Sequence, residues 1–151
     1  MSHEAFTRSL EALLGRTDLE ALSDLAALPV DAAKAKLTAF VGPLDFSLFQ
    51  KLDHGALLTV FRGERVRATT YVVGNALIAV QMTKHEPRAA LYVPLRLFVL
   101  GIDDAHVIVT YDRPSALMAQ FGSPDVDAVA RELDVKLERL LDETAARARA
   151  A

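Results

Sequence analysis

Met82 and His85 are the first residues of this chain whose types and spacing suit a chemical role. Three residues apart on a helix, they would present a thioether and an imidazole on one face, which is compatible with haem or copper ligation. His54 would have to join them from elsewhere in the fold. A core methionine followed by an exposed loop histidine before Pro87 explains the same residues, and we favour that interpretation. We therefore assign no metal site.

A hydrolytic site would need a nucleophile with a positioned base. Ser115, with His54 or His106 and Asp112, supplies the residue types, but no Gly-x-Ser-x-Gly motif surrounds the serine. Ser115 follows Pro114, and the start of a helix explains this pair more simply.

Two pairs of adjacent carboxylates do not form a convincing acid and base. Asp103 and Asp104 fall in an expected hairpin turn, and Asp142 and Glu143 lie on a solvated helix end. We assign no catalytic residue and interpret the chain as a non-enzymatic domain. An enzyme whose site is assembled only by folding stays open as an alternative.

Basic residues concentrate in the middle of the chain. Residues 46–101 hold 7 basic and 3 acidic residues, a net charge of +4, between flanks of −3 and −4. An anion site or charge complementarity within the folded domain would explain this distribution, and we favour the second. No aromatic residues alternate with Arg62, Arg65 and Arg67 as in a groove for single-stranded nucleic acid, so we expect no nucleic-acid partner.

A small anionic molecule is the more plausible ligand for these charges. Arg88 or Arg96 beside Tyr92 could hold it, because a pocket needs fewer basic residues than a strand of phosphates does.

Composition excludes several other classes of protein. The chain has no cysteine, which rules out disulfides, a thiol nucleophile and thiolate-bound zinc or iron–sulfur clusters. Its first residues lack the pattern of a secretory signal. The most hydrophobic run, 91–102, is shorter than the ~20 residues of a membrane helix. We expect a cytoplasmic protein with no membrane association and no cofactor.

Hydrophobic spacing and capping residues predict helices and strands in alternation. Helices are expected over 4–14, 17–28, 31–40, 55–61, 76–83, 114–122 and from 123 onward, and strands over 46–52, 66–73, 91–100 and 106–111. For 55–61 a strand is the alternative. Thr17 and Glu20 resemble a capping box, and Asp31 a third N-cap. In the last helix, one apolar stripe is predicted from Val126, Val129, Ala130, Leu133, Leu137, Leu140 and Leu141.

These elements predict an α+β fold with a single small β-sheet packed by helices and an N-terminal helical extension. We divide the chain into the extension over 1–43, an α/β domain over 44–145 and a frayed tail over 146–151. The extension has surplus apolar positions at Leu19, Leu22 and Leu25. We expect these to contact a second copy in a homodimer.

Three segments carry a family resemblance. The order GN at 74–75, LYVPLRLFV at 91–99 and VTYDRPSALMAQFG at 109–122 resembles the domain of unknown function 302 family. The resemblance covers roughly Phe46 to Leu141, and Ala76 stands where many members have a proline. It implies a compact α/β domain with a small sheet and packed helices, often dimeric, and no established activity.

The family's characteristic residues fall here on Asp53, His54, Gly74, Asn75, Pro94, Leu95, Tyr111, Pro114 and Ser115. Capping, turns and strand ends explain most of them. The polar exceptions, which include Asn75 and Tyr111, could line a shared pocket.

We therefore predict a ligand-binding or protein-interaction domain with a pocket near the Gly-Asn turn. The candidate ligand-binding residues are Asn75, His85, Arg88, Tyr92, Tyr111 and Asp112. The alternative is a haem- or metal-binding protein or enzyme with a site assembled from His54, His85 and Tyr111.

Overall fold

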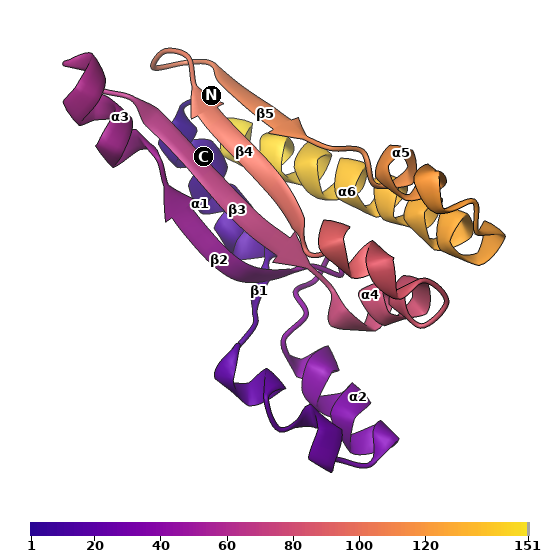
Figure 1. Ribbon diagram of the computed structural model, residues 1–151. Coiled ribbons are helices and arrows are strands. Elements are labelled where there is room, and N and C mark those ends of the chain that lie inside the picture. The colour runs from indigo at the N-terminus through magenta and orange to yellow at the C-terminus, as the bar shows by residue number, and fades with distance from the viewer. Residues whose placement is uncertain (151) are drawn as a thin grey trace.

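The computed structural model describes residues 1–150, and Figure 1 shows its ribbon. The α-helices are α1 (His3–Leu13), α2 (Val30–Ala39), α3 (Gly55–Arg62), α4 (Ala76–Thr83), α5 (Pro114–Met118) and α6 (Pro124–Ala150). The strands are β1 (Gly15–Arg16), β2 (Ser47–Asp53), β3 (Arg67–Gly74), β4 (Leu95–Gly101) and β5 (Val107–Tyr111). Short 3₁₀ helices are η1 (Glu20–Leu22), η2 (Leu25–Ala27), η3 (Pro87–Tyr92) and η4 (Ala119–Phe121).

The strands form one sheet in the order β1-β2-β3-β4-β5. β1 runs parallel to β2, and the other neighbouring strands are antiparallel. The register places Tyr71 of β3 opposite Lys51 of β2 and Leu97 of β4. The predicted α+β fold with a single small sheet is confirmed.

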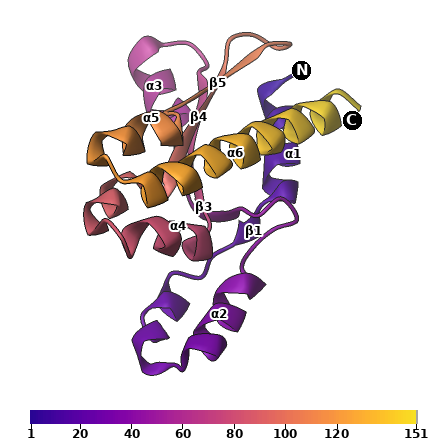
Figure 2. The ribbon, with the colours of Figure 1, turned by 90° about the vertical axis from the view of Figure 1, so that its right-hand side faces the viewer.

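Helices α1 and α6 pack together and cover one face of the sheet (Figures 1 and 2). The core between them contains the inward residues of the strands, among them Tyr71, Val73, Leu97 and Val99. The apolar stripe predicted for the last helix is buried at Val126, Ala130, Leu133, Leu137 and Leu140. A long amphipathic helix thus closes the core over most of the sheet's length.

A bulge at Phe49 changes which side chains of β2 point inward. The pairing of β2 with β3 shifts between Leu48 and Gln50, so the residues after the bulge change sides. Leu48 is buried, whereas Leu52 is 38% exposed. Strict alternation from Leu48 would place Leu52 on the inward side, but alternation alone cannot reveal an extra residue in one strand.

The segment between residues 17 and 41 forms a separate lobe at the bottom of Figure 1. Only η1, η2 and α2 form there, so the continuous helix predicted over 17–28 is wrong. None of the residues described between 17 and 41 is buried. Asp18, rather than the pair Thr17 and Glu20, accepts hydrogen bonds from backbone amides at 20 and 21. Without burial to reward a longer helix, local capping decides its structure.

Two backbones meet at the base of this lobe. The Phe46 carbonyl oxygen accepts hydrogen bonds from the amides of both Gly15, at 2.9 Å, and Gly42, at 3.0 Å. A Cβ on Gly15 would lie 1.9 Å from the carbonyl oxygen of Phe40. Only glycine permits this approach.

Helix α1 packs with the core. Phe6, Leu10 and Leu13 are buried, and the helix contacts α6 and β4. The division of the chain at residue 43 stays a prediction.

Two local predictions differ from the structure. Asp31 lies inside the first turn of α2, whose N-cap is Pro29. The strand expected from residue 91 begins only at Leu95, because η3 occupies Pro87–Tyr92. A glutamate caps η3, since Oε1 of Glu86 accepts a hydrogen bond from the amide of Arg88.

Within residues 1–150, no helix combines the length and the apolar character that crossing a membrane requires.

Candidate functional site

An apolar hollow of about 130 Å³ opens beside the turn between β3 and α4. Its walls include Phe49 of β2, Gly74 of β3, Ile78 and Met82 of α4, Leu95 of β4 and Leu133 of α6. Gly74 helps to keep it open, because a Cβ at this position would lie 3.1 Å from Cβ of Pro94 and 3.4 Å from Cε2 of Phe49. The bulge matters too, since it places Phe49 against this glycine.

Asn75 borders the hollow, but its polar atoms are already occupied. Its Oδ1 accepts hydrogen bonds from the amides of Leu77 and Ile78, and its Nδ2 donates to the carbonyl oxygen of Asp45 at 3.0 Å. Asn75 is thus the N-cap of α4, and it ties this helix to the loop before β2. Asn75 therefore shapes the wall of the hollow, while its own polar atoms already have partners within the protein.

A second, more polar hollow of about 210 Å³ adjoins the first and shares Asn75, Ile78 and Leu133 with it. Asp45, Gln81, Glu132 and Lys136 supply its polar groups. Lys136 donates a hydrogen bond to Oδ2 of Asp45 within an ion pair. Together the two hollows offer an apolar wall and a polar rim on one surface.

His85 and Arg88 lie beyond α4, next to the start of α6. Nδ1 of His85 is 3.9 Å from Oδ2 of Asp125. Arg88 donates two side-chain hydrogen bonds to Glu86, at 2.9 and 2.8 Å, and its guanidinium lies 5.4 Å from the Phe121 ring. The hydrogen bonds from Arg88 lower the pKa of Glu86 to about 2, so this pair stays ionised. The carboxylate of Glu86 thus compensates the positive charge of Arg88.

Tyr92 and Asp112 meet in a third hollow of only about 30 Å³, on the other side of Pro94 and Leu95. Arg96 lines the same space. The Tyr92 hydroxyl donates a 3.3 Å hydrogen bond to Oε1 of Gln120.

Tyr111 lies at the end of β5, opposite Leu97, and packs partly buried against the core. The candidate residues are therefore distributed over three places around the Pro94 segment: Asn75 at the paired hollows, Tyr92 and Asp112 at the small one, and His85 and Arg88 near α6.

His54, named in the haem or metal alternative, lies at the start of α3. Its Nε2 is 3.0 Å from Oγ1 of Thr70, and its ring packs edge-on against Phe98 at 6.2 Å. Thr70 and Phe98 pair across β3 and β4 and point away from the core. Across residues 1–150, no three His, Cys, Asp or Glu side chains lie close enough together to hold a metal ion.

Comparison with known proteins decides the family. The model of the family described as "Domain of unknown function DUF302" matches residues 23–144. The chain belongs to this family. A crystal structure of an uncharacterized conserved DUF302 protein from Bacillus stearothermophilus is similar, with a TM-score of 0.56 and 15% identity over 85% of this chain and 92% of that chain. This likeness shows a shared fold. No curated protein matches.

The resemblance drawn from the sequence is thus confirmed, and its residues acquire positions in the DUF302 fold. Gly74, Asn75, Pro94 and Leu95 all line the apolar hollow. Pro114 and Ser115 begin α5, and the amide of Ser115 donates to Oδ1 of Asp134 on α6 at 3.0 Å. Four of the characteristic residues therefore converge on one hollow.

Sequence reasoning missed a polar cluster, centred on a buried tyrosine, between the sheet and α1 of this DUF302 protein. The fully buried Tyr71 donates a 2.7 Å hydrogen bond to Oε1 of Glu11, which also accepts one from Lys51 at 2.6 Å. Burial, and then the hydrogen bond to Glu11, raise the pKa of Tyr71. Burial opposes ionisation of Glu11, but hydrogen bonds from Lys51 and Tyr71 hold its pKa below the ordinary value. The tyrosine stays neutral, so this cluster has a structural role. A tyrosine inside an apolar strand was its one signal.

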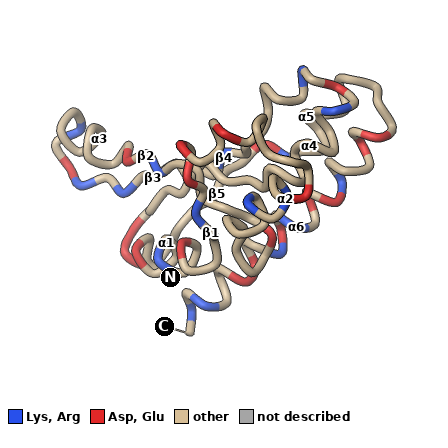
Figure 3. The backbone as a smooth tube through the Cα atoms, turned by 90° about the horizontal axis from the view of Figure 1, so that it is seen from below, with Lys and Arg blue, Asp and Glu red and all other residues tan. Residues whose placement is uncertain are grey.

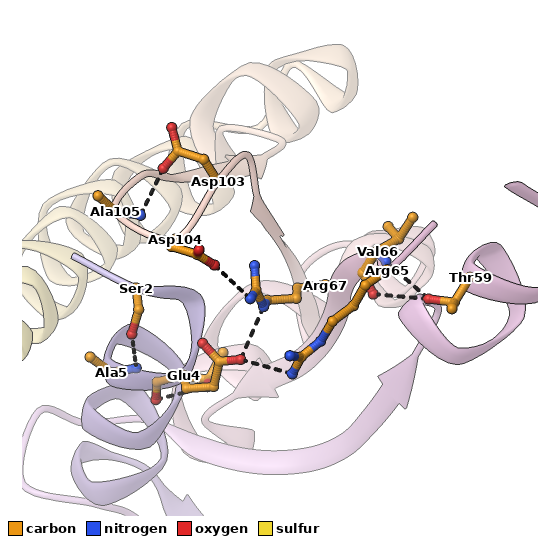
Figure 4. Close-up of polar contacts among 11 residues, drawn as sticks. Ser2, Glu4, Ala5, Thr59, Arg65, Val66, Arg67, Asp103, Asp104 and Ala105 are labelled. Carbon is orange, nitrogen blue, oxygen red and sulfur yellow. Dashed lines mark hydrogen bonds and ion pairs between the residues drawn. The ribbon is translucent and has the colours of Figure 1, made fainter. Parts of the chain in front are cut away.

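Most basic residues of the middle segment are likewise paired with nearby carboxylates. Figure 4 shows Arg67 between Glu4 and Asp104, with Arg65 also directed toward Glu4. Arg67 lies 2.7 Å from Asp104 and 3.1 Å from Glu4. Figure 3 likewise shows acidic and basic residues interspersed along the described chain. Charge complementarity within the domain is what this arrangement supports.

Proposed function

We propose that this DUF302 protein is a cytoplasmic binding domain for a small ligand with an apolar body and a hydrogen-bond-donating end. The observation that carries the proposal is the adjacency of the two hollows, which share Asn75, Ile78 and Leu133. Binding sites for small molecules typically combine an apolar pocket with a few polar groups that fix orientation.

The size of the apolar hollow sets the size of the group it would take. A dry apolar cavity of about 150 Å³ holds one benzene ring. The hollow of about 130 Å³ therefore suits a single ring or a branched aliphatic group of similar bulk.

The charges of the polar hollow favour a donor. Its one lysine, Lys136, already pairs with Asp45, and Glu132 adds a second carboxylate. A protonated amine or a hydroxyl placed here would meet carboxylate oxygens, whereas a carboxylate would be repelled.

The small anion expected from the sequence is the competing ligand. It would use Arg88 or Arg96, but Arg88 is paired with Glu86 and Arg96 lines the same small hollow as Asp112. These carboxylates weaken the case for an anion, and the same experiment tests it.

Titration of ¹⁵N-labelled protein with benzylamine, and separately with benzoate, distinguishes the two ligands. We expect benzylamine to shift the amide resonances of Ile78, Ala79 and Leu133, with a dissociation constant of roughly 1 mM for so small a probe. Shifts produced by benzoate around Arg96, with none from benzylamine, would overturn the proposal.

A matched pair of variants locates the probe. Ala79 lines the apolar hollow, and Ala79→Leu should fill it and remove binding. Ala116 is exposed on α5, and Ala116→Leu should leave binding unchanged. Equal binding by both variants would show that benzylamine sits elsewhere.

A further inference from the structure

The apolar face of helix α3 is exposed instead of packing against the core of its own chain. Leu57, Val60 and Phe61 are 63%, 76% and 81% exposed, and their spacing puts them on one face. The opposite face holds the buried Gly55 and the half-buried Thr59, whose hydroxyl accepts a hydrogen bond from the Val66 amide at 2.9 Å. We call Leu57, Val60 and Phe61 the α3 stripe. Such a stripe marks an interaction surface.

An open face of the sheet continues this apolar surface. Register places Ala68, Leu100 and Ile108 in one row across β3, β4 and β5. Ala68 is covered at the base of α3, where a Cβ on Gly55 would lie 3.0 Å from its amide nitrogen, while Ile108 is 51% exposed. We call Phe98, Leu100 and Ile108 the open sheet face. Figure 1 views it from the front, and beyond α3 none of the helices in residues 1–150 crosses it.

The charges around α3 are already paired. Arg62 forms an ion pair with Glu64, Arg65 lies 3.4 Å from Glu4, and Arg67 is held between Glu4 and Asp104. A rim neutralised in this way offers little attraction to an anionic membrane or to nucleic acid, both of which require net positive charge. It suits a neutral protein surface.

The chain therefore has both the α3 stripe and the open sheet face, an apolar surface on which the stripe of another copy can lie. Because a large apolar side chain presents roughly 150–200 Å², the α3 stripe with Leu52, Leu58 and Ile108 exposes on the order of 600 Å². This is about three quarters of the roughly 800 Å² that each partner buries in a stable interface, and the half-buried Phe98 and Leu100 of the open sheet face add to it. If two identical chains paired about a two-fold axis, the α3 stripe of each would be buried on the open sheet face of its partner.

We propose that two copies of this chain associate through the α3 stripe of each, packed on the open sheet face of the other. The contact lies at the opposite end of the molecule from Leu19, Leu22 and Leu25, which the sequence favours for dimerisation. The proposal stands apart from ligand binding, because neither hollow at Asn75 contains a residue of α3.

Sedimentation velocity on the full chain tests this proposal. We expect a dimer for the wild type, and Phe61→Glu should raise the dissociation constant about tenfold or more, since a charge enters an apolar contact. Ile108→Glu should do the same from the other side. Val135→Glu, at a residue 66% exposed on α6, is the matched control and should remain dimeric. Circular dichroism checks that each variant is folded.

Cysteine cross-linking tests the arrangement directly, because the chain has no cysteine of its own. Mixing Phe61→Cys protein with Ile108→Cys protein should give a heterodimer on oxidation, and mixing Val135→Cys with Ile108→Cys should not.

Three results would overturn the proposal. One is a wild type that stays monomeric up to its solubility limit, whether or not it binds phosphatidylglycerol vesicles through α3. Another is a dimer lost on Leu19→Glu but kept on Phe61→Glu, which would move the contact to the lobe. The third is Phe61→Cys protein that cross-links only to itself.

Discussion

The hydroxyl of Tyr71, in the middle of the sheet, donates a 2.7 Å hydrogen bond to the carboxylate of Glu11 on α1. Lys51 of β2 donates to the same oxygen and lies 5.6 Å from the centre of the tyrosine ring. One carboxylate thereby joins α1 to two strands across an otherwise apolar layer.

Removing that hydroxyl should cost measurable stability. Tyr71→Phe keeps the ring and deletes one hydrogen bond to a charged acceptor, so we expect the free energy of unfolding to fall by about 1.5–3 kcal/mol. Urea denaturation followed by circular dichroism measures this loss. Tyr92→Phe, which deletes a longer hydrogen bond at an exposed tyrosine, is the control and should change stability much less. Equal losses in both variants would contradict the role given to Glu11.

Glu11 should also make stability depend on acidity. Its pKa is lower in the folded state than its ordinary value of 4.5, so its contribution to stability is present above pH 4.5. The contribution is lost as pH falls through the lowered folded pKa. The difference in unfolding free energy between wild type and Glu11→Gln should therefore shrink between pH 5 and pH 3, measured by urea denaturation. Any pH dependence of stability that comes from His3 is the same in both proteins, so it cancels in this difference. A difference that stayed constant over this range would exclude the linkage.

Gly74→Ala tests how tightly the apolar hollow is built. The new methyl would meet Pro94 and Phe49 at 3.1 and 3.4 Å, so we expect a loss of about 1–3 kcal/mol from overpacking. The smaller hollow should also bind benzylamine several-fold more weakly. Thermal unfolding and the NMR titration measure the two effects. Unchanged stability together with unchanged affinity would show that the space at Gly74 is not part of the site.

Glu132 should decide between a donor and an anion in the polar hollow. Glu132→Gln removes a carboxylate while keeping the size of the side chain, so affinity for benzylamine should fall by about tenfold or less. Glu138→Gln, on the same helix but outside both hollows, is the control. Calorimetry with both probes distinguishes the outcomes, and a drop in affinity of equal size in both variants would reflect net charge alone.

Much of this fold was predictable because its elements carry strong local signals. The apolar stripe of α6, the glycine and asparagine that start α4 and the hydrophobic alternation of β3 each specify one structure. The side on which Leu52 lies was not predictable, because the bulge at Phe49 leaves no local signal.

The candidate site was less predictable, because its parts meet only in the folded chain. Gly74, Pro94 and Leu133 come from three distant segments, and nothing local in the sequence shows that they border one hollow. Asn75 borders this hollow, but its polar atoms serve the cap of α4 and the loop before β2. His85 and Arg88 follow α4 closely in sequence yet point toward the start of α6 and its preceding turn. From the sequence, α3 resembles an ordinary short apolar helix, and only the structure shows that its apolar face is exposed.

The shared carbonyl at the base of the lobe gives a fifth expectation. Gly15→Ala would force a methyl against the Phe40 carbonyl at 1.9 Å, so the two backbones must separate. We expect a loss of about 3 kcal/mol or more, measured by urea denaturation. Gly63→Ala, where a methyl would meet nothing within 4 Å, should cost only about 1–2 kcal/mol from its positive φ.

The carbonyl of Phe46 thus fastens together the two ends of the chain segment that forms the lobe. This carbonyl holds the outgoing chain at Gly15 and the returning chain at Gly42, and none of the residues between them is buried. We expect that shortening, lengthening or replacing that segment would leave both hydrogen bonds to Phe46, and the sheet, intact. It is the natural position at which to graft a foreign peptide into this fold.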